Sequence, residues 1–266
     1  MANPKQAAAA AQSSPALETI ARIGYVVLGI VHAVIGGIAI SVATGGGGEA
    51  DQGGAMEQIR SAPAGVLLLW IIALGLAALA FWQIGEAILE RNPDSKKKWG
   101  YRAKYIGTAV IYFAIAWTAL TYAIGGSSDS SGQSQSMSAQ LMATPGGSFL
   151  VGFIGLVVLA IGVAFVIRGF TRAFEKRLNI PAGTTGRGIV TFGVVGYVAK
   201  GIAVAITGIL FIVAAFTNDP TTAGGLDAAL HSLVGLPMGP VILWIVGAGL
   251  IIYGIFCLFR ARYARM

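Results

Sequence analysis

Charged residues are scarce in this sequence. Asp, Glu, Lys and Arg make up 11% of its 266 residues, whereas about 25% of the residues in a soluble globular domain are charged. Hydrophobic residues reach 56%. This composition excludes a disordered chain, because disorder requires low hydrophobicity and a high charge. We expect a lipid bilayer to be the solvent, so the length is divided among membrane spans and not among soluble domains.

Cysteine and histidine are nearly absent. The single cysteine, Cys257, excludes a disulfide framework, and the two histidines, His32 and His231, are too few for a zinc cluster. The sequence also lacks a nucleophile elbow, a zincin helix, a P-loop, a dinucleotide-binding fingerprint and a pair of intramembrane carboxylates. We therefore expect a protein that is not an enzyme, with no catalytic residues, no metal site and no cofactor.

Six apolar runs have roughly the ~20 residues that a helix needs to cross ~30 Å of hydrocarbon. They lie at about 23–43, 64–85, 105–124, 149–167, 189–216 and 239–259. Because a helix satisfies all its backbone groups internally, we predict six transmembrane helices. Ser41-Val42-Ala43 resembles a signal-peptide cleavage site, but the run before it exceeds the about 7–15 apolar residues of a signal peptide, so we expect this span to be retained.

Lysine and arginine gather on one side of the predicted spans. If the chain crosses the bilayer six times, every Lys and Arg except Arg60 falls on the side of the chain ends. The positive-inside rule then places both termini in the cytoplasm. The net charge of +7 is accounted for by loops that face anionic lipid headgroups, so we expect a lipid surface and no nucleic acid as a partner.

The sequence repeats one unit three times. Glu86, Arg168 and Arg260 each follow a proline by 23 residues, at the same end of an even-numbered span. Each of these prolines opens a Pro-x-Gly pattern at the end of an outer loop: Pro63-Ala64-Gly65, Pro145-Gly146-Gly147 and Pro237-Met238-Gly239. The shared spacing indicates a triplication.

The first span of each unit and the loop that follows also align. Gly24-Tyr25 corresponds to Gly196-Tyr197, and the next aligned positions are Gly29, Gly107 and Gly201. A polar segment with apolar residues at helical spacing precedes each proline, which predicts short amphipathic helices at the outer membrane face. The segments contain Met56 and Ile59, Met137, Leu141 and Met142, and Leu226, Leu230 and Leu233.

The predicted fold is an all-α integral membrane bundle of six transmembrane helices, built from three parallel two-helix repeats. Because each unit contains two spans, every unit starts on the same side, and we expect a pseudo-three-fold axis along the membrane normal. We also expect a disordered cytoplasmic N-terminal tail and a basic cytoplasmic C-terminus. The predicted boundaries are 1–20 for the tail and 21–98, 99–187 and 188–266 for the three repeats.

This pattern resembles a bacterial family known as domain of unknown function 1206, whose members carry three copies of a two-helix unit. The resemblance covers the chain from about Ala21 to Arg262 and rests on the repeat plan, the two Gly-Tyr pairs and the three Pro-x-Gly turns. It implies a protein of the bacterial inner membrane. The family brings no established activity and no catalytic residues. The second unit departs most, with Arg102-Ala103 in place of Gly-Tyr.

Two ionisable residues are predicted to lie within the membrane. His32 is about ten residues into the first span, near the bilayer centre, where an ionisable group is a candidate for proton transfer or ligand binding. The alternative is a neutral imidazole that hydrogen-bonds inside a close helix contact, as the surrounding glycines favour. Lys200 is about seven residues into the fifth span. Its side chain either extends to the cytoplasmic face, pairs with Glu86 or lines a cytoplasmic cavity.

Charged residues at the cytoplasmic end are predicted to form a ring. Glu86 stands where the other units have Arg168 and Arg260, so we expect it to form a salt bridge to one of these arginines or to Lys200.

Further basic residues are candidates for contact with anionic lipid. Phe170, Phe174 and Leu178 are spaced four residues apart, which predicts a basic amphipathic extension of the fourth helix. The candidate headgroup contacts are Lys96, Lys97, Lys98, Arg172, Lys176 and Arg177.

Three functions fit the sequence. The first is a non-catalytic scaffold or accessory subunit that binds a membrane protein partner, favoured by spans rich in Gly and Ala. The second is a small-solute or ion transporter or channel through the three-repeat bundle, weakened by the scarcity of polar residues in the spans. The third is a lipid- or quinone-binding protein. A polar stripe that reaches His32 would favour transport, an apolar lateral cleft would favour lipid, and an exposed face of small residues would favour a scaffold.

Overall fold

Six long helices form the body of the protein. The computed structural model describes residues 15–91 and 93–265 of the chain. The long helices are α2 (Pro15–Ala43), α4 (Gly65–Leu89), α5 (Ser95–Ala123), α7 (Gly147–Phe170), α8 (Thr184–Thr217) and α10 (Gly239–Tyr263). Each is long and apolar enough to cross a membrane, so the six predicted spans are confirmed. The protein is a multi-pass membrane protein built of helices.

Several helices extend beyond the predicted spans. Helix α2 begins at Pro15, so residues 15–20, which the sequence assigned to a disordered tail, are helical; residues 1–14 of that tail lie outside the described residues. Helix α5 begins about ten residues before its predicted span. The Asp94 carboxylate caps it by accepting hydrogen bonds from the backbone N–H groups of Lys96 and Lys97, as an N-cap aspartate commonly does.

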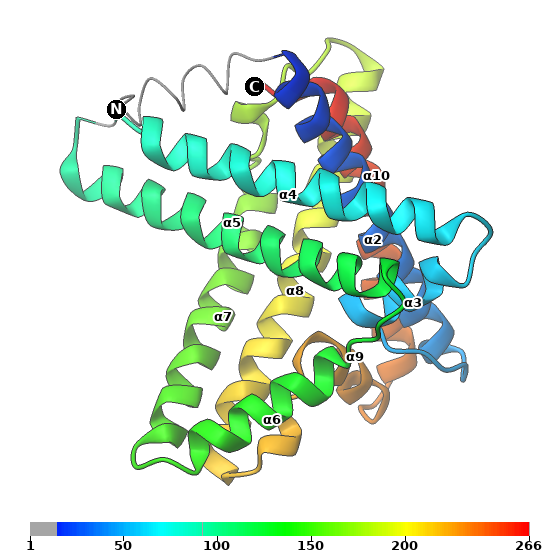
Figure 1. The fold of residues 1–266 in the computed structure, drawn as a ribbon, viewed down its shortest axis with the longest axis vertical. Coiled ribbons are helices and arrows are strands. Elements are labelled where there is room, and N and C mark those ends of the chain that lie inside the picture. Colours follow the sequence, from blue (N-terminus) through cyan, green and yellow to red (C-terminus); the bar gives the residue numbers. More distant parts are fainter. Residues whose placement is uncertain (1–14, 92, 266) are drawn as a thin grey trace.

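A short helix precedes the second long helix of each repeat, as the sequence predicts. These helices are α3 (Gln52–Arg60), α6 (Ser130–Met142) and α9 (Gly225–Val234). Asp51 caps α3 and Asp129 caps α6, each accepting a hydrogen bond from the backbone N–H three residues later. Helices α6 and α9 lie toward the end of the molecule opposite to the chain ends, and α3 lies at its side (Figure 1). We call the part formed by these three helices the hairpin end and the part that holds the chain ends the terminal end.

The Pro-x-Gly pattern forms the same turn three times. Its middle residue has positive φ in every repeat: Ala64 at 59°, Gly146 at 78° and Met238 at 59°. In the first repeat the Gly65 N–H donates to the Ala62 carbonyl oxygen at 2.9 Å, which together with Pro63 describes a type II turn. A Cβ atom on the last residue, Gly65, would collide with the Ile59 carbonyl oxygen, and the other two repeats share this restriction. The pattern is therefore dictated by the backbone of the turn.

The tightest helix pairs join successive repeats. Helix α4 packs on α5, α7 packs on α8, and α10 returns to pack on α2. Glycines at equivalent positions make two of these contacts close: a Cβ atom at Gly29 would lie 2.6 Å from the Gly254 carbonyl oxygen, and one at Gly201 would lie 2.7 Å from that of Gly162. Small residues at interfaces are how membrane helices gain close van der Waals packing.

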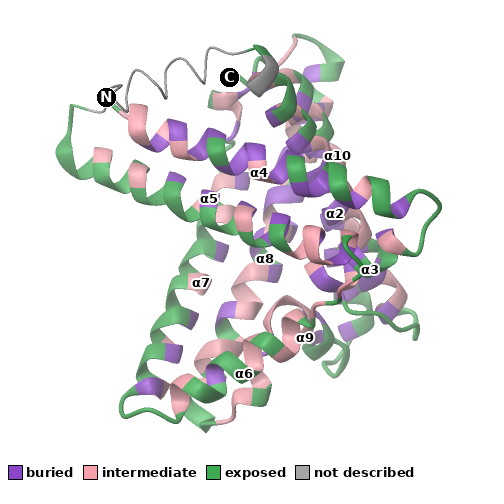
Figure 2. Cartoon of the chain, viewed as in Figure 1, coloured by how far each residue is buried: buried purple, intermediate pink, exposed green. Residues whose placement is uncertain are grey.

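The second repeat breaks the symmetry. Helices α2 and α4 pack together within the first repeat, and α8 and α10 within the third, but α5 and α7 do not pack along their length. In Figure 1, α4 and α5 run from side to side, whereas α7 and α8 run from top to bottom. The pseudo-three-fold axis is therefore not confirmed. Burial is concentrated in α2, α4 and α10, and little of α7 is buried (Figure 2). We call the side between α5 and α7 the open flank.

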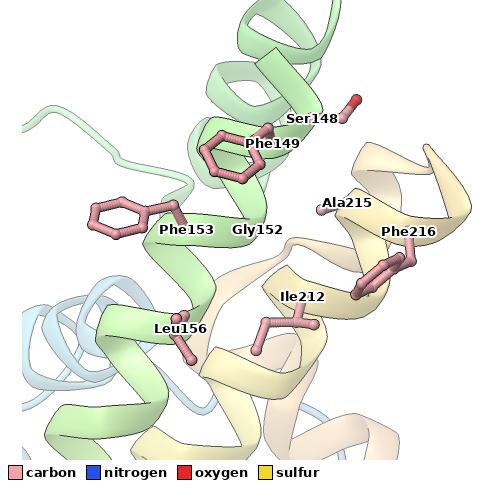
Figure 3. Close-up of a pocket in the computed structure, with 8 residues that line it drawn as sticks. All are labelled: Ser148, Phe149, Gly152, Phe153, Leu156, Ile212, Ala215 and Phe216. Atoms are coloured by element: carbon pink, nitrogen blue, oxygen red, sulfur yellow. The ribbon is translucent and has the colours of Figure 1, made fainter. Parts of the chain in front are cut away.

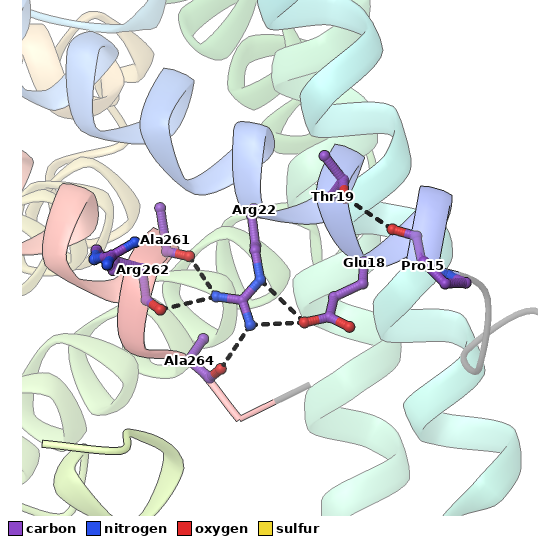
Figure 4. A network of polar contacts seen from close by, with 7 residues as sticks. All are labelled: Pro15, Glu18, Thr19, Arg22, Ala261, Arg262 and Ala264. Atoms are coloured by element: carbon purple, nitrogen blue, oxygen red, sulfur yellow. Dashed lines mark hydrogen bonds and ion pairs between the residues drawn. The ribbon is translucent and has the colours of Figure 1, made fainter.

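Arg22 ties the first helix to the last. Its guanidinium donates to the carbonyl oxygens of Ala261 at 2.7 Å, Arg262 at 3.0 Å and Ala264 at 3.4 Å, and it pairs with Glu18 at 2.7 Å (Figure 4). The carbonyls at a helix C-terminus have no partner within the helix. Arg22 supplies one and so closes the first repeat onto the third.

Candidate functional site

The chain turns sharply after α7. This helix ends at Phe170, and Arg172 has a φ of 53°, a conformation that a residue with a side chain adopts only at a cost. A short 3-10 helix, η1 (Glu175–Arg177), follows. Phe174 is buried, and its ring stacks on that of Tyr197 with centroids 5.3 Å apart. The predicted amphipathic extension of the fourth helix is therefore wrong. The helix ends at Phe170, and the chain turns so that Phe174 packs against Tyr197 and Phe256.

This turn completes a basic groove at the terminal end of the open flank. The groove lies between the first turns of α5 and the last turns of α7, with η1 and the turn before it on one side, and has a volume of about 510 Å³. Four of its side chains are basic and one is acidic: Lys104, Arg168, Lys176 and Arg177, with Glu90. Tyr101, Tyr105 and Ile167 are among its other lining residues.

Two arginines of the groove are positioned by tyrosine rings. Arg177 donates from Nη2 to the Tyr105 hydroxyl at 2.6 Å, and its guanidinium lies 5.2 Å from the centre of the same ring. The Arg168 guanidinium lies 5.3 Å from the centre of the Tyr197 ring. Its Nε is buried and has no hydrogen-bond partner among the described residues. The tyrosine rings thus hold both guanidinium groups in place at the wall of the groove.

The contact of Arg168 with Tyr197 recurs between the third and first repeats. Arg260 lies 4.3 Å from the centre of the Tyr25 ring and donates to its hydroxyl at 3.2 Å. Each arginine ends one repeat and each tyrosine belongs to the Gly-Tyr pair of the next. A cation–π contact of this kind contributes about 0.5–2 kcal/mol. The arginine at the end of one repeat and the tyrosine at the start of the next therefore form the same contact at two junctions.

The junction between α4 and α5 lacks this contact, because Glu86 and Ala103 take the positions of the arginine and the tyrosine. Glu86 and Arg260 line a polar cavity of about 170 Å³. Arg168 and Arg260 border a crevice next to it. The structure therefore gathers the three predicted members of the charge ring, with Arg260 in the middle.

An apolar groove lies between α7 and α8, nearer to the hairpin end. Its volume is about 470 Å³, and α7 and α8 provide its walls (Figure 3). Phe149 and Phe216 are 81% and 86% exposed, so the groove opens on the outer surface of the bundle. Ser148 is its one polar lining side chain.

The family model for the domain of unknown function DUF1206 matches the chain three times, at residues 23–90, 103–172 and 195–264. The chain belongs to the DUF1206 family. The uncharacterised protein YxxB of Bacillus subtilis (strain 168) is 30% identical to it over 259 residues, which are 96% of this chain and 94% of the relative. No solved structure matches the chain. The family relationship thus defines the repeat unit but assigns it no activity.

The two intramembrane candidates in this DUF1206 member meet at one tyrosine. The Tyr253 ring centre is 4.8 Å from that of His32, and the Lys200 Nζ is 3.5 Å from the Tyr253 hydroxyl oxygen and 4.5 Å from its ring centre. Nδ1 of His32 also lies 2.9 Å from the Leu28 carbonyl oxygen. Lys200 points into the bundle, where its ammonium also lies over the ring of Phe165, instead of extending to the membrane surface.

The predicted headgroup contacts divide into two groups. Lys176 and Arg177 line the basic groove, whereas Arg172 and the run of lysines that starts α5 do not. Sequence reasoning missed Lys104 as a site residue. The sequence signal for Lys104 was a positive charge directly before the third predicted span. It stands next to Arg102-Ala103, where the second repeat lacks the Gly-Tyr pair.

The hairpin end carries acidic side chains from all three repeats. Asp227 accepts a hydrogen bond from the Ala50 N–H at 2.7 Å, which joins the first repeat to the third. Burial raises the pKa of Asp51, and the Asp227 and Asp129 carboxylates raise it further against the opposing hydrogen bond from the Gly54 N–H. Burial likewise raises the pKa of Glu49, with Asp51 as the next cause. The carboxylates at this end repel one another, and the hydrogen bonds that Asp51 and Asp227 accept oppose this repulsion.

Proposed function

We propose that the protein is a non-catalytic membrane protein that binds phospholipid on the open flank between α5 and α7. The observation that carries the proposal is the basic groove at the terminal end of this flank, where an apolar surface meets four basic side chains. A phospholipid has the same division into an apolar tail and a charged head. By the positive-inside rule, the terminal end faces the cytoplasm of the bacterium.

Both grooves support lipid over solute transport. They lie on the outer surface of the bundle, beside α7, and not along a central path. Two ionisable residues within the spans, His32 and Lys200, contact Tyr253 within packed helices. A transport pathway would instead require polar side chains that line a continuous channel.

A scaffold that binds a membrane protein partner is the second candidate, and one observation favours it. Gly100, Ala103, Gly107 and Ala114 are exposed at helical spacing on α5. Such a face suits a second helix. The other glycine-rich faces support it less, because α2 and α8 use theirs for contacts inside the chain.

Photo-crosslinking in the native membrane separates these candidates. A photoreactive residue in place of Ile167, which lines the groove, should capture phospholipid even after extraction into gentle detergent. The matched control is Leu74 on α4, which is 64% exposed and lines neither groove, and which should capture lipid only before extraction. Equal loss of lipid at both positions after extraction would refute the proposal. Capture of one protein in stoichiometric amount at Ile167 would establish the scaffold instead.

A further inference from the structure

We propose that the basic groove binds the phosphate of an anionic phospholipid headgroup, with Lys104, Arg168, Lys176 and Arg177 as its ligands. The inference rests on the proposed function, since the tails of the lipid would occupy the open flank, and it adds the chemical class of the headgroup.

The charge of the groove is assembled from separate parts of the chain. Lys104 belongs to α5, Arg168 to α7, and Lys176 and Arg177 to η1. Among the described residues that line the same cavity, Glu90 is the one that is acidic. Gathering like charges at one place is unfavourable unless a counter-charge is present. The turn at Arg172, in a costly left-handed conformation, is what brings η1 to the groove. Strain maintained at one point of a fold is common where a ligand binds.

The donors of the groove suit a phosphate. A guanidinium presents a planar fork of N–H groups that matches phosphate oxygens, and an ammonium contributes a point charge. Arg177 is fixed by the Tyr105 hydroxyl and ring, and Arg168 by the Tyr197 ring.

The position of the groove favours a lipid phosphate over free phosphate. Ile167 lines the groove on α7 and is 56% exposed, so the groove opens on the apolar surface of a membrane-spanning helix. Tyr101 and Tyr105 also line it, and tyrosine is enriched at the level of lipid headgroups. Basic pockets between transmembrane helices on the cytoplasmic side bind anionic headgroups in other membrane proteins.

The test compares lipid retention by native mass spectrometry in micelles that contain phosphatidylglycerol and phosphatidylethanolamine. The variant replaces Lys104 and Lys176 with Gln, both exposed residues that tolerate the change. The control replaces Lys96 and Lys97 with Gln, which removes the same charge from nearby exposed positions outside the groove. Lys104 and Lys176 would touch the bound phosphate directly, whereas Lys96 and Lys97 do not line the groove. Because a charged hydrogen bond to a phosphate is worth roughly ten-fold in affinity or more, the variant should lose at least about ten-fold of its preference for phosphatidylglycerol.

The control should keep its preference within about two-fold, and replacing Lys104 and Lys176 with Arg should restore it, because Arg keeps the charge. Equal losses in variant and control, or no preference in the natural protein, would overturn the inference. Displacement of the lipid by millimolar inorganic phosphate would also overturn it, since the groove would then recognise free phosphate. If Ile167 captures lipid without a headgroup preference, the proposed function stands and this inference fails; if it captures none, both fail.

Discussion

One glycine position, repeated three times, should respond differently in each repeat. Gly29, Gly107 and Gly201 are equivalent in the sequence, yet a Cβ atom would collide with a backbone oxygen at Gly29 and Gly201 and would meet nothing within 4 Å at Gly107. Adding a methyl group to a packed interface costs about 1–3 kcal/mol. At an open helical position the same change is neutral or stabilises by up to about 1 kcal/mol. The three Gly→Ala variants carry the same chemical change and therefore control for one another.

Thermal unfolding in detergent, followed by circular dichroism, measures the difference. In a chain of this size each kcal/mol shifts Tm by roughly 2–4 °C. Gly29→Ala and Gly201→Ala should therefore lower Tm by roughly 2–12 °C, and Gly107→Ala should leave it unchanged or raise it slightly. If Gly107→Ala is as destabilising as the other two, α5 packs against a neighbour at this face, which the structure leaves open.

Three other changes test the rest of the fold. Gly65→Ala should lower Tm in the same assay, because a Cβ atom would meet the Ile59 carbonyl oxygen in the turn; an unchanged Tm would refute the assigned turn. Asp51→Asn should raise Tm at neutral pH and preserve the cap. Because the pKa of Asp51 is higher in the folded protein than its ordinary value of 3.8, ionisation of this carboxyl lowers the stability of the natural protein as the pH rises through the folded pKa. The variant cannot ionise at this position and should lose this part of the pH dependence. Arg22→Gln removes charged hydrogen bonds to three carbonyl groups and should cost about 1.5–3 kcal/mol; a loss below the error of the assay would argue against closure of the first repeat onto the third.

The second repeat shows how a local change of sequence accompanies a change of packing. The arginine–tyrosine contact joins α7 to α8 and α10 to α2. Between α4 and α5 both partners differ, with Glu86 for the arginine and Ala103 for the tyrosine. The second repeat, which contains Ala103, is also the repeat whose two long helices, α5 and α7, do not pack along their length. The groove that we assign to lipid thus lies where the repeated unit departs from its own pattern.

The spans and the turns could be predicted from the sequence because their causes are local. A hydrophobic run of sufficient length must be helical in lipid, and the Pro-x-Gly pattern matches the dihedral angles of its turn. The groove could not be predicted in the same way. The spacing of Phe170, Phe174 and Leu178 fits a continued helix, but a chain that turns at Arg172 can bury the same apolar side chains. The spacing alone therefore does not distinguish the two structures.

The orientation of α5 was also beyond sequence reasoning. Lipid tails are as apolar as a protein core, so hydrophobicity does not reveal which face of a membrane helix points inward. Gly107 aligns with two glycines that are tightly packed, and the alignment alone would place it at an interface. The structure leaves it exposed. The loss of the neighbouring Gly-Tyr pair was the one local sign that this repeat differs.

The most direct test of the account is a cryo-electron microscopy structure of the full chain in nanodiscs that contain phosphatidylglycerol. We expect density for a headgroup phosphate between Lys104, Arg168 and Arg177, continuous with acyl-chain density along the open flank. A helix of another protein in that flank, or α5 packed closely on α7 with the groove closed, would contradict the account.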